Sequence, residues 1–224
     1  MAVFPVTEGQ IDFDAPGTSK RCKTWYKIVG SLEPSSTPLI ALHGGPGAGH
    51  KYLSPLTDLY KQGGIPIIFY DQVGCGRSTH LQEHMGDESF WTFDLFFKEL
   101  DNLIDHFHLR ETGFYILGQS WGGILGGAYA SRRPKGLRKL ILASGPSSIP
   151  LYMEGCQALL SELPPDVRKT LEDCERRGDY ESEEFEKAAA VFYGRHVCRL
   201  EPYPDDVLAA FKNLKEDPTS YLTM

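Results

Sequence analysis

The chain has 224 residues, of which 41% are hydrophobic, 24% charged and 12% aromatic. These fractions are close to globular averages and exclude a disordered, collagen-like or disulfide-knotted protein. The net charge of −7 comes from residues 151–224, which carry 16 acidic and 9 basic side chains, whereas residues 1–150 carry 14 of each. Because no basic stripe is present to bind phosphates, we exclude nucleic acid as a partner.

The N-terminus lacks the basic and apolar segments of a secretory signal, and the longest apolar run, residues 65–70, is far shorter than the roughly 20 residues that span a bilayer. Five cysteines, an odd number without a C-x-x-C pair, indicate neither a disulfide framework nor a thiolate zinc site. We therefore expect a soluble, cytoplasmic protein that does not act at a membrane.

The first 150 residues alternate between strand and helix patterns. Short β-branched or apolar runs predict strands at 24–30, 38–42, 65–70, 114–117 and 140–143. Residues 91–109 form the clearest helix, with an apolar stripe and with Lys98, Glu99, Asp101 and Asn102 largely on the opposite face. A second helix over 124–133 ends at Pro134. The alternation predicts an α/β fold with a doubly wound, mostly parallel sheet, whose chemistry lies at the carboxyl ends of the strands.

The character changes after Pro146. Proline, serine and glycine signals predict helices over 165–178, 183–199 and 204–215, without intervening strands. We therefore expect two parts, an α/β core over residues 1–146 and an acidic helical segment over 147–224.

A strand followed by G-x-S-x-G-G and a helix occurs at residues 114–123. A nucleophile on so sharp a turn needs strained backbone angles, and Gly118 and Gly122 remove the Cβ atoms that would clash. Ser120 is therefore the candidate nucleophile. The N–H of Trp121, at the start of the helix, is a candidate oxyanion donor. The alternative is a glycine-rich turn with an incidental serine.

The motif H-G-G-P-G follows the strand that ends at Leu42. A glycine-rich loop allows a backbone N–H to approach a substrate, so Gly45 is the candidate for a second oxyanion donor and Gly44 the neighbouring possibility. The alternative is a tight turn with a structural histidine.

The motif D-Q-x-G-x-G-x-S follows the strand at 65–70. We expect Asp71 and Arg77 to pair across this loop and to hold its shape as a scaffold for the oxyanion loop. Cys75 is then a loop residue and not a nucleophile.

Together these three motifs resemble the prolyl aminopeptidase (proline iminopeptidase) and amino-acid amidase family of α/β-hydrolases, and residues 192–199 look like part of that family's helical cap. The resemblance implies a serine hydrolase with an inserted cap, which releases an N-terminal residue such as proline from a small peptide or hydrolyses an amino-acid amide or ester. Carried over by position, Ser120 is the nucleophile, and Trp121 and Gly45 form the oxyanion hole. No metal or other cofactor is expected.

In this fold the triad acid and base lie on loops after the last sheet strands, which in the family follow the cap. The sequence ends at Met224 within the part that resembles the cap, so we expect the last core strands, and with them the triad Asp and His, to be missing. His196 lies within a predicted helix, and Glu154 is a candidate for the acid or a substrate contact. Without a base Ser120 is a poor nucleophile, so little hydrolysis is expected from this chain alone.

Two other functions stay open: a non-catalytic binding or regulatory protein, and one half of an enzyme that a second polypeptide completes. An open sheet edge would also favour self-association. His80-x-x-Glu83-His84 matches an inverted zinc-protease pattern, but the neighbouring glycines predict a polar loop, so no metal site is assigned. Nucleotide-binding glycine motifs fail on spacing.

Overall fold

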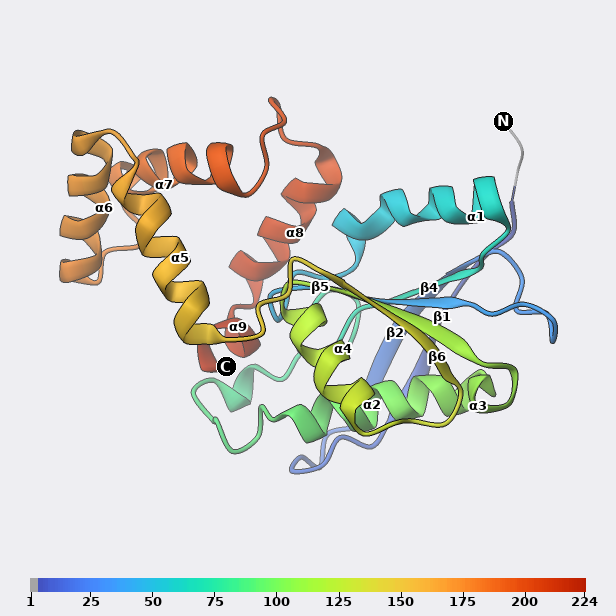
Figure 1. Ribbon diagram of the computed structural model, residues 1–224. Helices are drawn as coiled ribbons and strands as arrows, with labels where there is room; N and C mark the ends of the chain where they lie inside the picture. Colours follow the sequence, from blue (N-terminus) through green and yellow to red (C-terminus); the bar gives the residue numbers. More distant parts are fainter. Residues whose placement is uncertain (1–3) are drawn as a thin grey trace. The chain divides into compact units, whose positions relative to one another are not determined.

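The computed structural model describes residues 4–224, which form two compact units (Figure 1). The first unit comprises residues 4–145 together with Asp206–Met224, and the second is Pro146–Asp205. The break after Gly145 coincides with the change from alternating strands and helices to helices alone.

A six-stranded sheet in the order β1-β2-β4-β3-β5-β6 forms the centre of the first unit. Its strands are β1 (Val6–Phe13), β2 (Cys22–Val29), β3 (Leu39–Leu42), β4 (Ile67–Tyr70), β5 (Phe114–Gln119) and β6 (Leu137–Ala143). The last four are parallel, whereas β1 and β2 run antiparallel to their neighbours. The predicted mostly parallel sheet is therefore confirmed for its centre. The prediction missed β1, because its many polar residues do not form an apolar run; β1 and β2 make a two-stranded antiparallel extension of the sheet.

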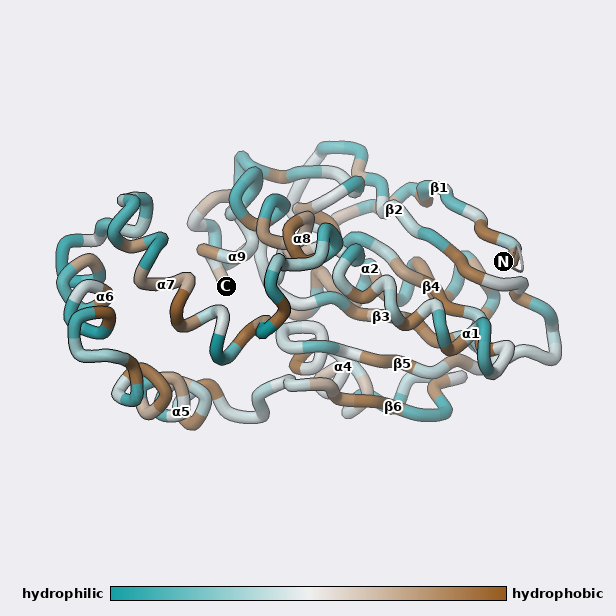
Figure 2. Tube along the Cα trace, turned by 90° about the horizontal axis from the view of Figure 1, so that it is seen from above, coloured by the Kyte–Doolittle hydropathy of each residue, from teal (hydrophilic) through white to brown (hydrophobic). Residues whose placement is uncertain are grey.

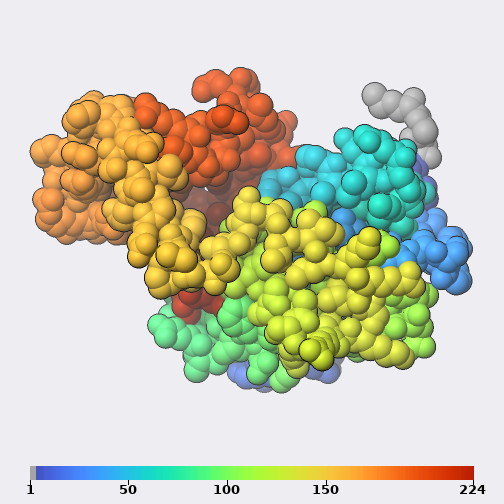
Figure 3. Space-filling model, viewed as in Figure 1, coloured from blue at the N-terminus to red at the C-terminus, as the bar shows by residue number. Residues whose placement is uncertain are grey.

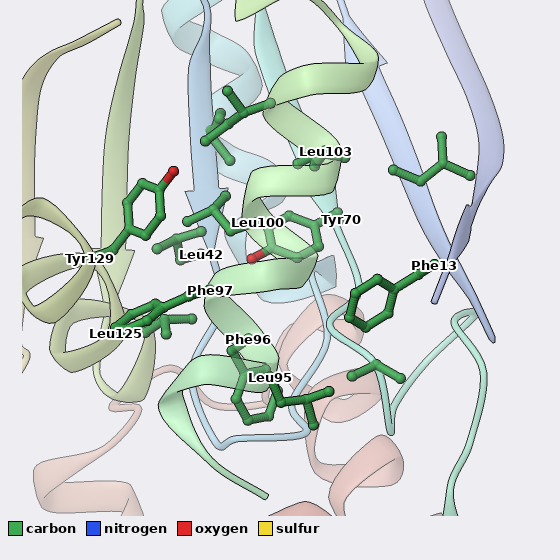
Figure 4. Close-up of a cluster of buried hydrophobic side chains, with 14 of the residues drawn as sticks. Phe13, Leu42, Tyr70, Leu95, Phe96, Phe97, Leu100, Leu103, Leu125 and Tyr129 are labelled. Carbon is green, nitrogen blue, oxygen red and sulfur yellow. The ribbon is translucent and has the colours of Figure 1, made fainter. Parts of the chain in front are cut away.

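Helices cover the two faces of this sheet unequally. The helical elements of this part include the short 3₁₀ helices η1 (Lys51–Leu56) and η2 (Gln82–His84) and the α-helices α1 (Thr57–Gly63), α2 (Phe93–His106), α3 (Leu109–Thr112) and α4 (Trp121–Ser131). On one face α2 and α4 pack against alternate strand residues in a large core that includes Leu42, Tyr70, Leu100 and Leu125 (Figure 4). On the other face η1 and α1 cover a smaller cluster around Phe69. Hydrophobic residues accordingly concentrate in the central strands (Figure 2).

The order of the strands places the three sequence motifs together. Strand β3 lies between β4 and β5, and the three strands are parallel. The motif loops begin at His43, Asp71 and Ser120, immediately after the carboxyl ends of these strands. In doubly wound sheets, ligands bind at the carboxyl ends of the strands, at the point where the order of the strands reverses its direction across the sheet.

The second unit consists of α5 (Ile149–Ser161), α6 (Pro165–Arg177) and α7 (Glu183–His196). Side chains of Ser148 and Ser182 cap the N-termini of α5 and α7, and Gly178 ends α6 in the left-handed conformation. Helices α6 and α7 pack together, and Arg177 pairs with Glu184 between them. Among residues 4–224 no helix is both long and apolar enough to cross a membrane.

The expected division placed all of residues 147–224 in one helical segment, whereas the structure assigns the C-terminal residues to the first unit. Helix α8 (Asp205–Glu216) and helix α9 (Thr219–Thr223) belong, from Asp206 onward, to the first unit. Asn213 donates a hydrogen bond to the Ala48 carbonyl over 2.9 Å, and the buried Asp217 carboxylate contacts His80. These contacts join residues far apart in the sequence, which is why local helical patterns could not reveal them.

Candidate active site

Ser120 lies on a sharp turn between β5 and α4 and has backbone angles of φ 54° and ψ −122°. Non-glycine residues rarely adopt such a positive φ, and where they do the strain commonly marks a functional site. Two glycines permit the turn: a Cβ atom on Gly118 would overlap the Gly122 carbonyl, and one on Gly122 would overlap the Leu42 carbonyl. The structure thus has the steep strand-to-helix turn that the G-x-S-x-G pattern predicts.

The first turn of α4 directs backbone donors toward the region around Ser120. The Ser120 carbonyl accepts hydrogen bonds from the N–H groups of Gly123 at 2.8 Å and Ile124 at 3.1 Å. The N–H of Trp121 precedes them at the helix N-terminus, where the first N–H groups have no partner within the helix and attract negative charge. The position of Trp121 therefore suits a donor to a developing oxyanion.

The glycine-rich loop after β3 lies against Ser120. A Cβ atom on Gly44 would come within 3.1 Å of Ser120 Cβ and 2.9 Å of Gln119 Oε1, so the loop approaches the nucleophile turn closely at this glycine. Gly44 is buried, whereas Gly45 is partly exposed and has φ 115°. Gly44 is thus adjacent to the nucleophile turn, and Gly45 follows it directly in the loop.

A buried network joins the three motif loops. The side-chain amide of Gln72 donates to the His43 carbonyl at 3.2 Å, and its oxygen accepts from the Trp121 indole N–H at 3.0 Å. The backbone N–H of Gln72 donates to His43 Nε2 at 3.0 Å. Burial lowers the pKa of His43, which keeps the imidazole neutral and able to accept this bond. His43 is therefore structural, as the alternative interpretation of the glycine loop proposed.

The expected side-chain pairing of Asp71 with Arg77 is wrong. Asp71 accepts from His50 Nδ1 at 2.7 Å and from the backbone N–H of Arg77 at 3.0 Å, while the Arg77 guanidinium pairs with Glu8 at 2.7 Å and lies over Trp25. Burial alone would raise the pKa of Asp71, but the hydrogen bond from His50 holds it below its ordinary value. The carboxylate still organises the loop, through backbone and histidine donors.

Glu99 was assigned to the exposed face of its helix, and this assignment is wrong. The side chain is fully buried and accepts hydrogen bonds from Thr24 Oγ1 at 2.5 Å and from the Val73 N–H at 2.9 Å. It therefore connects α2 to the loop of the D-Q-x-G-x-G-x-S motif. Burial raises the pKa of Glu99 to about 8 against the opposing effect of these two hydrogen bonds. Its spacing from Phe96 and Leu103 on the apolar stripe is the signal that could have revealed this position.

The other residues considered from the sequence lie in other environments. Glu154 and His196 are exposed on α5 and α7 of the second unit. Cys75 is buried, and burial raises the pKa of its thiol well above the ordinary value, which makes it a poor nucleophile. His80 and His84, which define the zinc-like pattern, contact Asp217 and Asp87 separately.

One group of three metal-ligating side chains comes together within residues 4–224, formed by Cys174, Asp179 and Glu184 in the second unit. The Arg177 guanidinium lies among them, 3.4 Å from Cys174 Sγ and 3.6 Å from Asp179, and pairs with Glu184. A cation of the protein itself therefore balances these groups.

Comparison with known proteins defines the fold class of the chain. Residues 37–222 match the family model of the α/β hydrolase fold. The crystal structure of VinJ superposes with a TM-score of 0.90 at 42% identity over 97% of this chain and 70% of that chain. The crystal structure of proline iminopeptidase from Mycobacterium smegmatis gives a TM-score of 0.81 at 36% identity over 95% of this chain and 69% of that chain.

Curated relatives narrow the class. The proline iminopeptidase of Thermoplasma volcanium is 36% identical over 89% of this chain, and that of Saccharolobus solfataricus is 37% identical over 84%. The chain belongs to the proline iminopeptidase family of α/β-hydrolases. It spans 65% and 58% of the lengths of these two relatives.

Two glycines of α4 test the steric account of the turn. Gly122→Ala is expected to lower the free energy of unfolding by about 3 kcal/mol or more, because the new methyl group would overlap the Leu42 carbonyl. Gly127→Ala, on the same helix with no atom within 4 Å of the added Cβ, is the control and should be neutral or stabilising by about 0.5–1 kcal/mol. Urea unfolding measures both, and equal effects would contradict the account.

Glu99 gives a prediction for pH dependence. The folded protein retains the Glu99 proton up to about pH 8, whereas the ordinary pKa is 4.5, so the stabilisation is complete below pH 4.5 and is lost as the pH rises to 8. Relative to Glu99→Gln, the free energy of unfolding of the unmodified chain should fall by up to about 1.4 kcal/mol per pH unit in this window. Parallel stability curves from urea unfolding at pH 5, 6.5 and 8 would refute the assignment.

Proposed function

We propose that the chain carries the nucleophile and oxyanion donors of a serine hydrolase that releases an N-terminal residue, proline among them, from small peptides or hydrolyses amino-acid amides or esters. The observation that carries this proposal is Ser120 on its strained turn, with the first turn of α4 on one side and the glycine loop on the other. Relatives named proline iminopeptidase, at 36–37% identity over most of the chain, support this substrate class.

The proposed reaction uses Ser120 and two backbone donors. Ser120 Oγ attacks the scissile carbonyl carbon, and the N–H groups of Trp121 and Gly45 donate to the resulting oxyanion. Collapse of the tetrahedral intermediate breaks the bond to the leaving amine, or to the alcohol of an ester, and leaves an acyl group on Ser120. Water then hydrolyses this ester and restores the serine. Each stage requires a base that accepts and returns a proton.

Four of the histidines are engaged in contacts away from Ser120. His43 and His50 are buried in the loop network, and His80 and His84 contact aspartates. Among the hydrogen bonds of residues 4–224, none joins the Ser120 side chain to a histidine. We therefore propose that this chain alone is a slow hydrolase, since a serine without a base is a poor nucleophile.

A specific observation favours a second role, as one part of a larger assembly. Strand β6 is the terminal strand of the sheet, and its Ile141 and Leu142 side chains are 42% and 55% exposed. The yellow-green part of the chain, which includes β6, lies at the surface of the first unit in Figure 3. Parallel strands are ordinarily buried on both faces, so this edge is suited to pairing with another copy or with a complementing polypeptide.

All five cysteines are free thiols. Free thiols are the expected state in a reducing compartment, and we include a cytoplasmic location in the proposal.

Labelling of Ser120 tests the proposed hydrolase. A fluorophosphonate probe should attach to Ser120, as located by peptide mass spectrometry, at a rate several orders of magnitude below that of a complete triad. Ser120→Ala should abolish labelling, while Ser131→Ala at the other end of α4 should not change it. Equal labelling of Ser120→Ala would contradict the proposal, and rapid turnover of prolyl naphthylamide by the chain alone would overturn the claim that a base is lacking.

The open edge predicts concentration-dependent association. Sedimentation velocity should show larger species as the concentration rises, and Ile141→Lys should suppress them, since a charged side chain disfavours edge pairing. Leu59→Lys changes a comparably exposed leucine on α1 and is the matched control. A monomer at all concentrations, or equal suppression by both variants, would show that the edge does not mediate association.

A further inference from the structure

The half-buried Tyr52, on η1, bridges the glycine loop and the strand that carries the nucleophile. Its hydroxyl accepts a hydrogen bond from the Gly44 N–H at 2.6 Å and donates one to Gln119 Oε1 at 2.5 Å. A neutral phenol can fill both roles at once, and burial raises the pKa of Tyr52 to about 12, so the hydroxyl stays protonated. Tyr52 was not among the residues indicated by the motifs.

The Gly44 carbonyl is held as well. It accepts from the Ala48 N–H at 3.2 Å and lies 2.9 Å from His43 Nδ1. His43 Nε2 accepts from Gln72, so Nδ1 carries the proton of the neutral ring and donates to Gly44. Gly44 is thus fixed at its N–H by Tyr52 and at its carbonyl by the two donors.

These contacts determine which N–H group of the loop remains available. The Gly44–Gly45 peptide is trans, since within residues 4–224 the cis bonds precede Pro46 and Pro202, so the Gly45 N–H points opposite to the Gly44 carbonyl. The Gly44 N–H is occupied by Tyr52, whereas the Gly45 N–H makes none of the backbone hydrogen bonds found in the described part of the chain.

We propose that Tyr52 is a positioning residue for the reaction at Ser120: by binding the Gly44 N–H and Gln119, it fixes the glycine loop so that the Gly45 N–H, and not that of Gly44, is the loop's oxyanion donor. This inference rests on the proposed hydrolase function. It also assigns a role to Gln119, whose side-chain oxygen anchors Tyr52 to the residue directly before the nucleophile.

The experiment compares the unmodified chain with Tyr52→Phe, Gln119→Met and the double variant. Tyr60→Phe, on the adjacent helix α1, is the matched control. Two readouts are taken on the full chain: the hydrogen-exchange rate of the Gly44 amide by NMR, and the rate of Ser120 labelling by the fluorophosphonate, separated into reversible binding and covalent bond formation. Thermal unfolding and circular dichroism establish that each variant is folded.

Tyr52→Phe should speed exchange of the Gly44 amide by about 10-fold or more, since its acceptor is lost. It should slow the bond-forming step by about 10-fold with little change in reversible binding, because the oxyanion forms only in that step. Gln119→Met should act in the same direction, and the double variant should add little beyond Tyr52→Phe, since both changes break one clamp. Tyr60→Phe should change neither rate.

Unchanged exchange at Gly44 in Tyr52→Phe would overturn the clamp, whether or not Ser120 reacts. Faster exchange together with an unchanged bond-forming rate would overturn its role in the reaction. If the unmodified chain is not labelled at Ser120, the proposed hydrolase function fails and the role of Tyr52 in the reaction fails with it, while the exchange measurement still decides whether the hydrogen bond exists. If Tyr60→Phe changed the exchange rate and the bond-forming rate as much as Tyr52→Phe does, the effect would be a general structural one. This result would also overturn the proposal.

Discussion

The close approach of the first turn of α4 to the end of β3 is the constraint on which the site depends. The Gly122 backbone lies against the Leu42 carbonyl with no room for a Cβ atom, and Gly118 lies equally close to Gly122. The chain between them must therefore turn through Ser120 at φ 54°, a conformation that costs on the order of 1–3 kcal/mol. Burial of Leu125 and Tyr129 from the same helix offsets this cost, so core packing fixes the serine.

A second constraint explains why three glycine-rich motifs occur together in one chain. Glycine loops have high conformational entropy, so hydrogen bonds or packing must hold them in one conformation. Gln72 supplies such bonds to both neighbouring loops, through the His43 carbonyl and the Trp121 indole, in a buried setting where an unpaired polar group costs about 1–3 kcal/mol. Each loop therefore depends on the polar groups of the others, and the motifs function as a set.

Structure could be predicted from the sequence where the local sequence signals agree with the burial of the residues. The central strands are buried on both faces and produce apolar runs, and the turn at Ser120 requires glycines at fixed offsets, so both could be predicted. Glu99 and Arg77 were misplaced because polar residues were assumed to face solvent or their nearest opposite charge, whereas the structure buries Glu99 against backbone donors and pairs Arg77 with Glu8. The partners of Tyr52 and Asn213 depend on tertiary contacts that no local pattern encodes.

The glycine loop is held at two points, and this bears on the slow hydrolysis proposed for this chain. Tyr52 and His43 fix Gly44 at the start of the loop, and Asn213 of α8 binds the Ala48 carbonyl further along it. A loop fixed in this way stabilises charge without reorganising during the reaction, which is the source of most oxyanion-hole catalysis. Transfer of the Ser120 proton has no comparable preparation among the described histidines. Slow hydrolysis by this chain would therefore reflect the missing proton acceptor, and reagents that need little base assistance should still detect the oxyanion donors.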